Sequence, residues 1–268
     1  MDIIGIIGAG NMGGALARGM LKKGAVAAEN LIVYDADRAK LESFTKETGA
    51  STAAGNVDLV EKADIVILAV KPDIAPGVLA EVSSAFTCGK LLLSIVLGLS
   101  LEKMSALSGG RARCARCMPN TPALVNEGMT CVAMGEGAEP GDKETVAALL
   151  GSVGMIEFMK EKDLEKVTAL TGSSPAYVFM FIEAMADAAV LSGLPRDLSY
   201  KLASQAVLGS AKMALESGRR PAELKDMVCS PAGSTIEAVR VLEAKGFRSA
   251  VIEAMRACDL RAREIAGK

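Results

Sequence analysis

A glycine-rich turn close to the start of the chain is the feature that most constrains its fold. Gly8, Gly10 and Gly13 follow an apolar run at 3–7 and open a segment with helical spacing. Such glycine-rich turns also occur between strands and helices that bind no nucleotide. Where a dinucleotide does bind, one glycine lets the chain turn sharply, one lets backbone N–H groups approach a diphosphate, and one lets the helix pack close to the strand.

An acidic residue after the next predicted strand favours the dinucleotide interpretation. The apolar run 31–34 ends in Asp35, within the interval of roughly 20 residues after the glycines at which a carboxylate accepts from ribose hydroxyls. The alternative is that Asp35 caps a helix or ends a turn before Arg38. The spacing of the motif favours cofactor recognition over the capping role.

Composition narrows the class of protein. The 268 residues are 50% hydrophobic but only 3% aromatic, so the core is aliphatic and methionine-rich. The net charge is −2 and no basic run interleaves with aromatic residues, which argues against a nucleic-acid partner. No apolar run approaches the ~20 residues of a membrane span. The first predicted strand starts almost at Met1, so we expect no leader peptide. We therefore expect a cytoplasmic protein with no membrane segment.

Six cysteines and the absence of histidine limit the chemistry. The cysteines are scattered among apolar residues, which favours buried, reduced thiols. Cys114 and Cys117 have the spacing of half a zinc or redox site, but a strand at 113–117 would place them on opposite faces, so we expect no metal. Without imidazole, catalysis has to use a cofactor, hydroxyls, carboxylates, lysines or backbone groups.

Strands and helices alternate through the first part of the chain, which predicts a doubly wound α/β sheet of the Rossmann-like kind. The fully apolar runs 65–70 and 91–96 are typical of parallel strands buried on both faces. Pro119 and Pro122 predict an irregular loop at 118–122. The other predicted strands are 31–34, a short piece at 51, 113–117, 130–134 and 155–159, and the predicted helices are 11–23, 37–48, a brief one from 56, 74–85 and 141–150.

From about residue 163 every segment has a helical period, so we predict a dinucleotide-binding domain over 1–162 and an all-helical domain over 163–268. Segment 175–191 is apolar nearly all round, and such a helix requires cover on several sides, which a second subunit would supply. Glu183 and Asp187 lie one turn apart and could form a carboxylate pair for catalysis. An exposed or interface-paired face is the favoured interpretation of these two acids.

Candidate binding residues gather where parallel strands end, because ligands of such sheets bind beyond the carboxyl ends of the strands. Lys71 could contact phosphate or ribose through its side chain or its backbone, or lie in solvent. Ala69 and Val70 either pack in the core or form a floor for the cofactor. The cofactor candidates at this edge are Gly8, Gly10, Asn11, Met12, Gly13, Asp35, Arg38, Ala69, Val70, Lys71, Pro72, Asn120 and Thr121.

A second candidate cluster lies in the helical half, at 229–235. Ser234 or Thr235 could cap the helix that follows, or the small residues could present a concave set of N–H groups suited to a carboxylate. The pattern leaves these two interpretations about equal. The loop at 171–175 is similar, and its hydroxyls could face solvent or a cleft.

Taken together, these motifs resemble the pyrroline-5-carboxylate reductases, in order and over essentially the whole chain. The stretch 224–235, Leu-Lys-Asp-Met-Val-Cys-Ser-Pro-Ala-Gly-Ser-Thr, is the most specific part, and the glycine turn is the least specific. The other matching motifs are 69–72, 118–122, 172–177, Leu194-Pro195, 209–213 and 246–248.

The resemblance implies an enzyme that transfers hydride from NADPH or NADH to the C=N carbon of 1-pyrroline-5-carboxylate, giving L-proline. This would be the last step of proline biosynthesis, catalysed by an oxidoreductase. It also implies a helical dimerisation domain interlocked with that of its partner, and a ring of such dimers as a further assembly. A cyclic imine can accept hydride as its iminium, so this chemistry suits a chain without histidine.

The resemblance also implies roles for individual residues. Ser230 and the N–H groups from Gly233 to Thr235, including that of Ser234, would hold the substrate carboxylate. The Thr235 hydroxyl would contact the ring nitrogen region. Further implied residues are Thr171 and Ser173 lining the same cleft, Asn56 at a cofactor ribose, and Asn120 and Thr121 near the nicotinamide, and each site would borrow the 230–235 cluster from a neighbouring subunit.

Three positions depart from the pattern of the family. Asp35 stands where relatives often have a small polar residue, and a carboxylate would accept from a 2′-hydroxyl but repel a 2′-phosphate. Arg38 could offset that repulsion, so the preference between NADH and NADPH stays open with a lean to NADH. The bulky residues 95–97 before Gly98 could reshape the cofactor floor, and Ala232 replaces a usual glycine.

Two other functions are compatible with the same residues. A small hydroxyacid dehydrogenase, or another imine reductase, on this plan would need an acid at the substrate for carbonyl chemistry, and Lys212 and Lys225 are its candidates. A non-catalytic dinucleotide sensor would bind the reduced cofactor without consuming it.

Overall fold

The computed structural model describes residues 2–265 and separates into two compact units. The sheet unit comprises the described residues up to Gly172 together with those from Asp259 onward, and the helical unit comprises Ser173–Cys258. The end of the last helix therefore packs with the sheet unit. The domain boundary expected at 162/163 remains a prediction.

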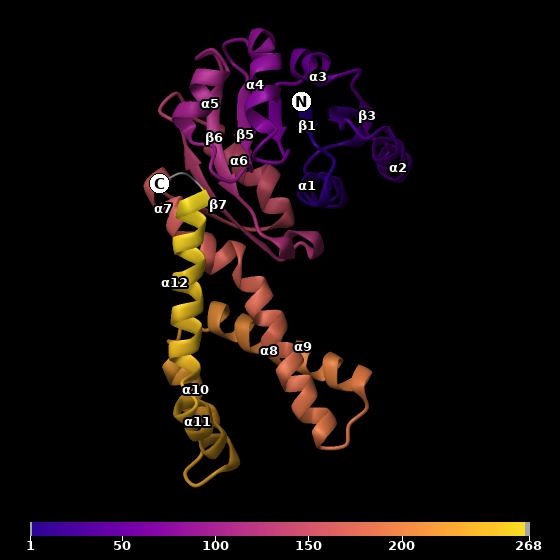
Figure 1. Ribbon diagram of the computed structural model, residues 1–268. Coiled ribbons are helices and arrows are strands. Elements are labelled where there is room, and N and C mark those ends of the chain that lie inside the picture. Colours follow the sequence, from indigo (N-terminus) through magenta and orange to yellow (C-terminus); the bar gives the residue numbers. More distant parts are fainter. Residues whose placement is uncertain (1, 266–268) are drawn as a thin grey trace. The chain divides into compact units, whose positions relative to one another are not determined.

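The sheet unit is built on an eight-stranded sheet of order β3-β2-β1-β4-β5-β6-β7-β8 (Figure 1). The strands from β1 to β6 are parallel, β7 runs antiparallel to β6, and β8 is parallel to β7. The order reverses between β1 and β4, which is the position where ligands of doubly wound sheets bind. The strands are β1 Ile4–Ile7, β2 Leu31–Tyr34, β3 Ser51–Thr52, β4 Ile65–Leu68, β5 Leu91–Ser94, β6 Arg113–Met118, β7 Gly128–Met134 and β8 Gly154–Phe158.

The central strands are buried on both faces because their residues alternate between two cores. In β4, Ile65 and Ile67 belong to one core, while Val66 and Leu68 belong to the other. Full burial of each such side chain contributes about 1.5–3 kcal/mol. The helices of this unit are α1 Asn11–Lys22, α2 Arg38–Thr48, α3 Asn56–Lys62, α4 Ala75–Val82, α5 Leu101–Leu107, α6 Asp142–Leu150 and α7 Glu161–Leu164.

The fold confirms the predicted alternation of strands and helices, with local corrections. Strand 31–34 has the predicted bounds, and α2 ends at Gly49, whose φ of 72° only glycine adopts freely. The predicted strands 65–70 and 91–96 end earlier, at Leu68 and Ser94, because their last apolar residues pack from the loops beyond the sheet.

The prediction of an irregular loop at 118–122 is wrong in part. Met118 is the last residue of β6, and a 3₁₀ helix, Thr121–Val125, begins within the segment. Pro122 occupies the first turn of that helix, where a missing N–H costs nothing.

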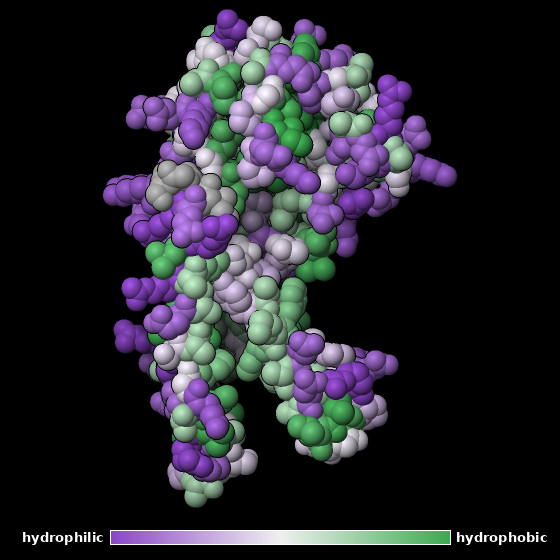
Figure 2. All heavy atoms as spheres, viewed as in Figure 1, coloured by the Kyte–Doolittle hydropathy of each residue, from purple (hydrophilic) through white to green (hydrophobic). Residues whose placement is uncertain are grey.

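The helical unit confirms the all-helical expectation for this part of the chain. Its helices are α8 Ser174–Leu191, α9 Arg196–Glu216, α10 Pro221–Val228, α11 Ser234–Ala244 and α12 Phe247–Ile265. Helices α8 and α9 pack against each other after a break at Gly193, whose φ is 96°. Apolar surface lies open on this unit (Figure 2).

Helix α8 buries little of its apolar surface within the chain. Ala186 is its fully buried residue, whereas Phe179 is 61% exposed and Met180 is 69% exposed. The stretch Glu161–Leu191 is also long and apolar enough to cross a membrane, by length and composition only. This amends the expectation that no stretch approaches that length, although the core helix of a soluble protein can have the same length and composition.

Candidate active site

The glycine turn has the geometry that close approach of a ligand requires. Gly8 has a φ of 102°, and a Cβ there would lie 2.7 Å from the carbonyl oxygen of Ala69. A Cβ on Gly13 would lie 2.0 Å from the Gly8 carbonyl oxygen, so any larger residue would push α1 away from β1. A Cβ on Gly10 would meet nothing within 4 Å. The three glycines therefore provide the turn, the close helix packing and an open approach.

Helix α1 begins directly at this turn. Gly10 is its N-cap and no side chain caps the helix, so the first turn, which begins with Asn11 and Met12, has no side-chain acceptor for its N–H groups. The positive end of the helix dipole lies at the same place. This arrangement suits an anion.

Asp35 is fixed beside the glycine turn through both of its carboxylate oxygens. Its Oδ2 accepts from the Ala9 N–H at 2.8 Å, and its Oδ1 accepts from the Asp37 N–H at 2.9 Å. The Nζ of Lys40 lies 3.9 Å from Oδ2. Helix α2 is capped by Asp37, which accepts from the Lys40 N–H, so the interpretation of Asp35 as the helix cap is wrong. The bond from the Asp37 N–H to Asp35 is that of a turn residue, so the turn part of that alternative agrees with the structure.

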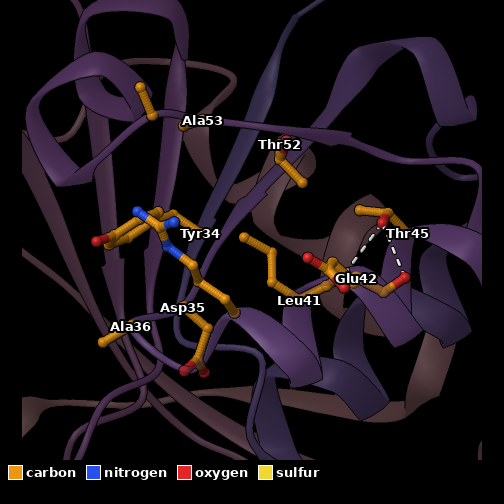
Figure 3. A pocket seen from close by; sticks show the side chains of 10 residues that line it. Tyr34, Asp35, Ala36, Leu41, Glu42, Thr45, Thr52 and Ala53 are labelled. Atoms are coloured by element: carbon orange, nitrogen blue, oxygen red, sulfur yellow. Dashed lines mark hydrogen bonds between the residues drawn. The ribbon is translucent and has the colours of Figure 1, made fainter.

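A hollow of about 370 Å³ lies beside Asp35 at the end of β2. Tyr34, Thr52 and Leu41 lie around it in Figure 3, and Thr45 donates to the carbonyls of Leu41 and Glu42. Its lining residues are Tyr34, Asp35, Ala36, Arg38, Leu41, Glu42, Thr45, Thr52, Ala53 and Ala54. The apolar and hydroxyl-bearing wall is of a kind that takes a flat heterocycle.

The segment after β4 closes the glycine turn from the other side. The Ala69 N–H donates to the Ile7 carbonyl. Val70 lies beside Gly8, because a Cβ added to Gly8 would be 3.3 Å from the Cγ1 of Val70. The Lys71 carbonyl accepts from the N–H groups of Ile74 and Ala75, so the backbone of this residue starts α4. The side chains of Lys71 and Pro72 are exposed.

Asn56 opens α3 and has an incompletely bonded side chain. Its Nδ2 donates to Glu81 Oε2 at 2.9 Å, while its Oδ1 is buried and has no hydrogen-bond partner in the described structure. A buried carbonyl oxygen without a donor is costly. This atom could accept a hydrogen bond from a bound hydroxyl.

Beyond β5, the bulky residues that depart from the family pattern are accommodated by the core. Ile95 packs against one apolar core and Val96 is buried in the other, while Leu97 is 41% exposed. Gly98 has a φ of 77°. Ile95 and Val96 therefore pack inward, whereas Leu97 does not.

Asn120 joins three segments of the sheet unit. Its Nδ2 donates to the Thr171 carbonyl at 3.0 Å, and its Oδ1 accepts from the Met129 N–H at 2.8 Å. Thr121 is exposed and begins the 3₁₀ helix. The Thr171 hydroxyl donates to the Val167 carbonyl, within the same helical turn.

The loop 230–235 of the helical unit leaves the amino end of α11 without a side-chain cap. Gly233 is the N-cap and Ser234 is already helical, so the interpretation of Ser234 or Thr235 as the cap is wrong. A Cβ on Gly233 would lie 2.3 Å from Ser230 Oγ, so glycine lets the Ser230 hydroxyl approach the helix end. Ala232, where the resemblance predicts a glycine, has a φ of 57°, in the left-handed region that favours glycine.

Other polar residues of the helical unit are paired with one another. Ser173 Oγ accepts from Cys258 Sγ at 3.2 Å, and hydrogen bonding to Cys258 raises the pKa of Tyr177. Asp187 pairs with Arg196, whereas Glu183 is exposed, so this acid pair has no shared buried site.

The lysines proposed as acids for carbonyl chemistry are also paired. The Nζ of Lys212 lies 3.7 Å from the Oε1 of Glu216, one turn along α9. A hydrogen bond to Asp226 raises the pKa of Lys225. Stabilising the charged form makes Lys225 a weaker proton donor.

All six cysteines are free thiols, but the expectation that they are buried holds only for Cys114, Cys117 and Cys131, since Cys88 is exposed and Cys229 and Cys258 are half-buried. Burial raises the pKa of Cys114 to about 11 and that of Cys117 to about 12, which keeps both thiols protonated near neutral pH. They lie in different cores, one on each face of the sheet, as the strand alternation predicts. Within residues 2–265, no group of three or more His, Cys, Asp or Glu side chains is arranged to hold a metal.

The sheet unit fits a dinucleotide. The open side of Gly10, the uncapped amino end of α1, the fixed carboxylate of Asp35 and the unpartnered Asn56 Oδ1 are each a feature that such a ligand would complete. Sequence reasoning missed Lys40, Glu81 and the wall formed by Tyr34 and Thr52. The cap sequence at Asp37 could have placed Lys40, but the Asn56–Glu81 contact joins residues 25 positions apart and has no local signal.

Comparison with known proteins identifies the two parts of the chain separately. Residues 161–265 match the family model described as pyrroline-5-carboxylate reductase dimerisation. Residues 3–98 match the model described as NADP oxidoreductase coenzyme F420-dependent. The chain is thus similar to a nucleotide-dependent oxidoreductase at one end and to a dimerisation domain at the other.

Relatives match over nearly the whole length. The pyrroline-5-carboxylate reductase of Escherichia coli is 48% identical over 255 residues, 95% of each chain. That of Methanosarcina acetivorans is 41% identical over 99% of this chain and 98% of its own.

Solved structures agree with the sequence relatives. The reductase from Coxiella burnetii superposes with a TM-score of 0.92 at 33% identity, covering 98% of both chains. The Plasmodium falciparum pyrroline carboxylate reductase with NADP bound superposes with a TM-score of 0.88 at 35% identity, covering 99% of this chain and 98% of its own. The chain belongs to the pyrroline-5-carboxylate reductase family.

Proposed function

We propose that this protein reduces 1-pyrroline-5-carboxylate to L-proline with hydride from NADPH or NADH, as the last step of proline biosynthesis. The observation that carries this proposal is the 48% identity to the Escherichia coli reductase over 95% of both chains. The absence of histidine agrees with it, because an imine substrate can arrive already protonated and needs no imidazole acid.

The sheet unit binds the cofactor in this proposal. Backbone N–H groups at Gly10, Asn11 and Met12 contact the diphosphate, with Gly8 and Gly13 shaping the turn. When bound, the cofactor supplies hydride to the C=N carbon. The remaining cofactor residues are Asp35, Arg38 and Asn56 at the adenosine end, Ala69, Val70, Lys71 and Pro72 beside the turn, and Asn120 and Thr121 on the nicotinamide side.

The loop at the start of α11 binds the substrate carboxylate. The amino end of α11 has no side-chain cap, and glycine at 233 lets the Ser230 hydroxyl lie against it. The N–H groups of Gly233, Ser234 and Thr235 complete the anion site. Thr235, which is half-buried, holds the ring nitrogen region through its hydroxyl, and Thr171 and Ser173 line the cleft.

Catalysis then depends on placement and charge. Fixing the iminium ring by its carboxylate removes its translational freedom before hydride transfer. A hydrogen bond from the ring nitrogen region to Thr235 orients the C=N carbon. No residue of the chain has to donate a proton in this scheme.

The assembly is a homodimer whose helical domains interlock, and such dimers further associate into a ring. The exposed apolar residues of α8 support the dimer. Each active site consists of the dinucleotide-binding domain, 1–162, of one protomer and the 230–235 cluster of its neighbour. That cluster belongs to the neighbour's helical domain, 163–268. The protein acts in the cytoplasm, without nucleic acid or membrane as a partner.

Replacing Thr235 tests the proposal at the substrate. The assay follows loss of 340 nm absorbance of each reduced cofactor with 1-pyrroline-5-carboxylate. We expect Thr235→Ala to lower kcat/KM about tenfold or more, because one transition-state hydrogen bond of ~1.4 kcal/mol is lost. The matched control is Thr145→Ala, at a half-buried threonine of α6.

Two results would count against the assignment. An unchanged rate in Thr235→Ala would remove this hydroxyl from the site. Tight binding of a reduced cofactor by the parent protein, with no absorbance loss on adding the imine, would instead identify a dinucleotide sensor.

A further inference from the structure

We infer that Asp35 makes this protein prefer NADH over NADPH, an inference that rests on the proposed function. The carboxylate accepts hydrogen bonds from the 2′- and 3′-hydroxyls of the adenosine ribose and repels a 2′-phosphate. The argument depends on where the carboxylate is held and on the charges around it.

The carboxylate cannot turn away from a ligand. Its Oδ2 is bound by the Ala9 N–H at 2.8 Å and its Oδ1 by the Asp37 N–H at 2.9 Å. Ala9 lies inside the glycine turn, and Asp37 precedes α2, so two rigid segments hold the side chain from opposite ends. The negative charge therefore has a fixed position next to the turn that approaches the diphosphate.

The fixed carboxylate still has room to accept from hydroxyls. A carboxylate offers about four lone-pair directions, and the two backbone N–H groups use two of them. A ribose with free hydroxyls can donate to the remaining two. A 2′-phosphate brings acceptor oxygens and a charge of about −2, and it finds no donor on an ionised carboxylate.

The neighbouring charges do not provide a phosphate site. Lys40 Nζ is 3.9 Å from Asp35 Oδ2, so its charge is directed at that carboxylate. Arg38 lines the hollow, but Glu42 lines it too, and the acid Asp37 directly precedes Arg38 in the sequence. Over residues 35–42 the acids outnumber the bases by three to two, so the segment has no excess of positive charge for a phosphate.

The amino end of α2 is closed as well. A phosphate at this position would be expected to use free N–H groups of the helix. Here the Asp37 side chain accepts from the Lys40 N–H and occupies the cap. An acidic cap at the amino end of α2, and a lysine already directed at Asp35, therefore both disfavour a 2′-phosphate beside the hollow.

Direct binding to the parent protein tests the inference without catalysis. NADH and NADPH are titrated separately, in the absence of substrate, and followed by nicotinamide fluorescence, which is favourable because the chain contains no tryptophan. We expect the Kd for NADPH to exceed that for NADH at least about tenfold. ADP-ribose should likewise displace bound NADH at lower concentrations than 2′-phospho-ADP-ribose.

Asp35→Ser removes the charge and supplies a hydroxyl. We expect the Kd for NADPH divided by the Kd for NADH to fall by about tenfold or more. The matched control is Asp2→Ser, an exposed acid just before the amino end of β1, at the edge of the sheet opposite the glycine turn, and it should leave the ratio unchanged. If Asp35→Ser does not fold, the ADP-ribose comparison on the parent protein decides.

Equal affinities, or tighter NADPH binding, in the parent protein would overturn the inference, and so would an unchanged ratio in a folded Asp35→Ser. An active reductase that prefers NADPH would refute the inference and leave the proposed function standing. A parent protein that binds neither reduced cofactor would refute both.

Discussion

At the scale of single residues, the most informative position is Ala232. It adopts the left-handed conformation, with a φ of 57°, that its usual glycine adopts without strain. A non-glycine residue in this region is strained by roughly 1–2 kcal/mol. Gly233 is the cap of α11 directly after this residue, so the strained alanine lies at the start of that helix.

Ala232→Gly should therefore raise the free energy of unfolding by up to about 1 kcal/mol, because the relieved strain exceeds the ~0.4–1 kcal/mol lost to a more flexible unfolded chain. Chemical denaturation measures this change. Ala238→Gly, at an exposed position inside α11, is the matched control and should destabilise by about 1 kcal/mol. A loss of stability in Ala232→Gly would show that the strain is relieved in another way.

At the scale of elements, α8 is unlike the helices of the sheet unit. Those helices turn one apolar face to a core, as α1 does with Leu16 and Met20, which are fully buried. Helix α8 instead exposes Phe179, Met180 and, at 90%, Leu191. A helix with this surface is expected to be covered in the assembly, which agrees with the dimerisation model matched by residues 161–265.

Phe179→Glu should weaken association of the subunits. Burying one phenylalanine contributes about 1.5–3 kcal/mol, and in a two-fold interface each substitution counts twice. We expect the dissociation constant, measured by sedimentation or light scattering over a dilution series, to rise at least about 100-fold. Met155→Glu, at a residue 59% exposed on β8 of the sheet unit, is the control and should leave the mass unchanged. A parent protein that is a stable monomer would contradict the role of α8.

At the scale of the whole molecule, the division into two units raises the question of which chain completes which site. The glycine turn and Asp35 lie in the sheet unit, and the 230–235 loop lies in the helical unit. Our proposal assigns the two parts of one site to different protomers.

Mixing two variants, each impaired in a different part of the site, tests that assignment. Gly10→Leu should fold, because a Cβ there meets nothing within 4 Å, yet block the diphosphate. Refolding it together with Thr235→Ala should restore up to about a quarter of parental activity, since half of the random dimers contain one site free of both substitutions. Activity no higher than the mean of the two separate variants would place both parts of the site in one chain.

The strands and helices of the sheet unit were largely predictable because each has a local signal. The apolar run 31–34 has its predicted bounds since a glycine-poor, β-branched run is flanked by polar residues. The runs 65–70 and 91–96 were predicted too long because apolar composition does not distinguish a strand from a loop that packs into the same core. The 3₁₀ helix Thr121–Val125 was missed for a related reason, since proline excludes helix interiors but not first turns.

By itself, the sequence determined the glycine turn, the alternation of apolar strands, the helical second half and a chemistry without imidazole, because periodicity, glycine spacing and composition are local properties. Only the tertiary structure decided that Asp35 is held by Ala9 and Asp37 and that Asn56 keeps an unpartnered oxygen. Ala9 and Asp35 are 26 positions apart and meet because β1 and β2 pair in parallel. Hydrogen bonds of this kind follow from the register of the sheet, which no local pattern contains.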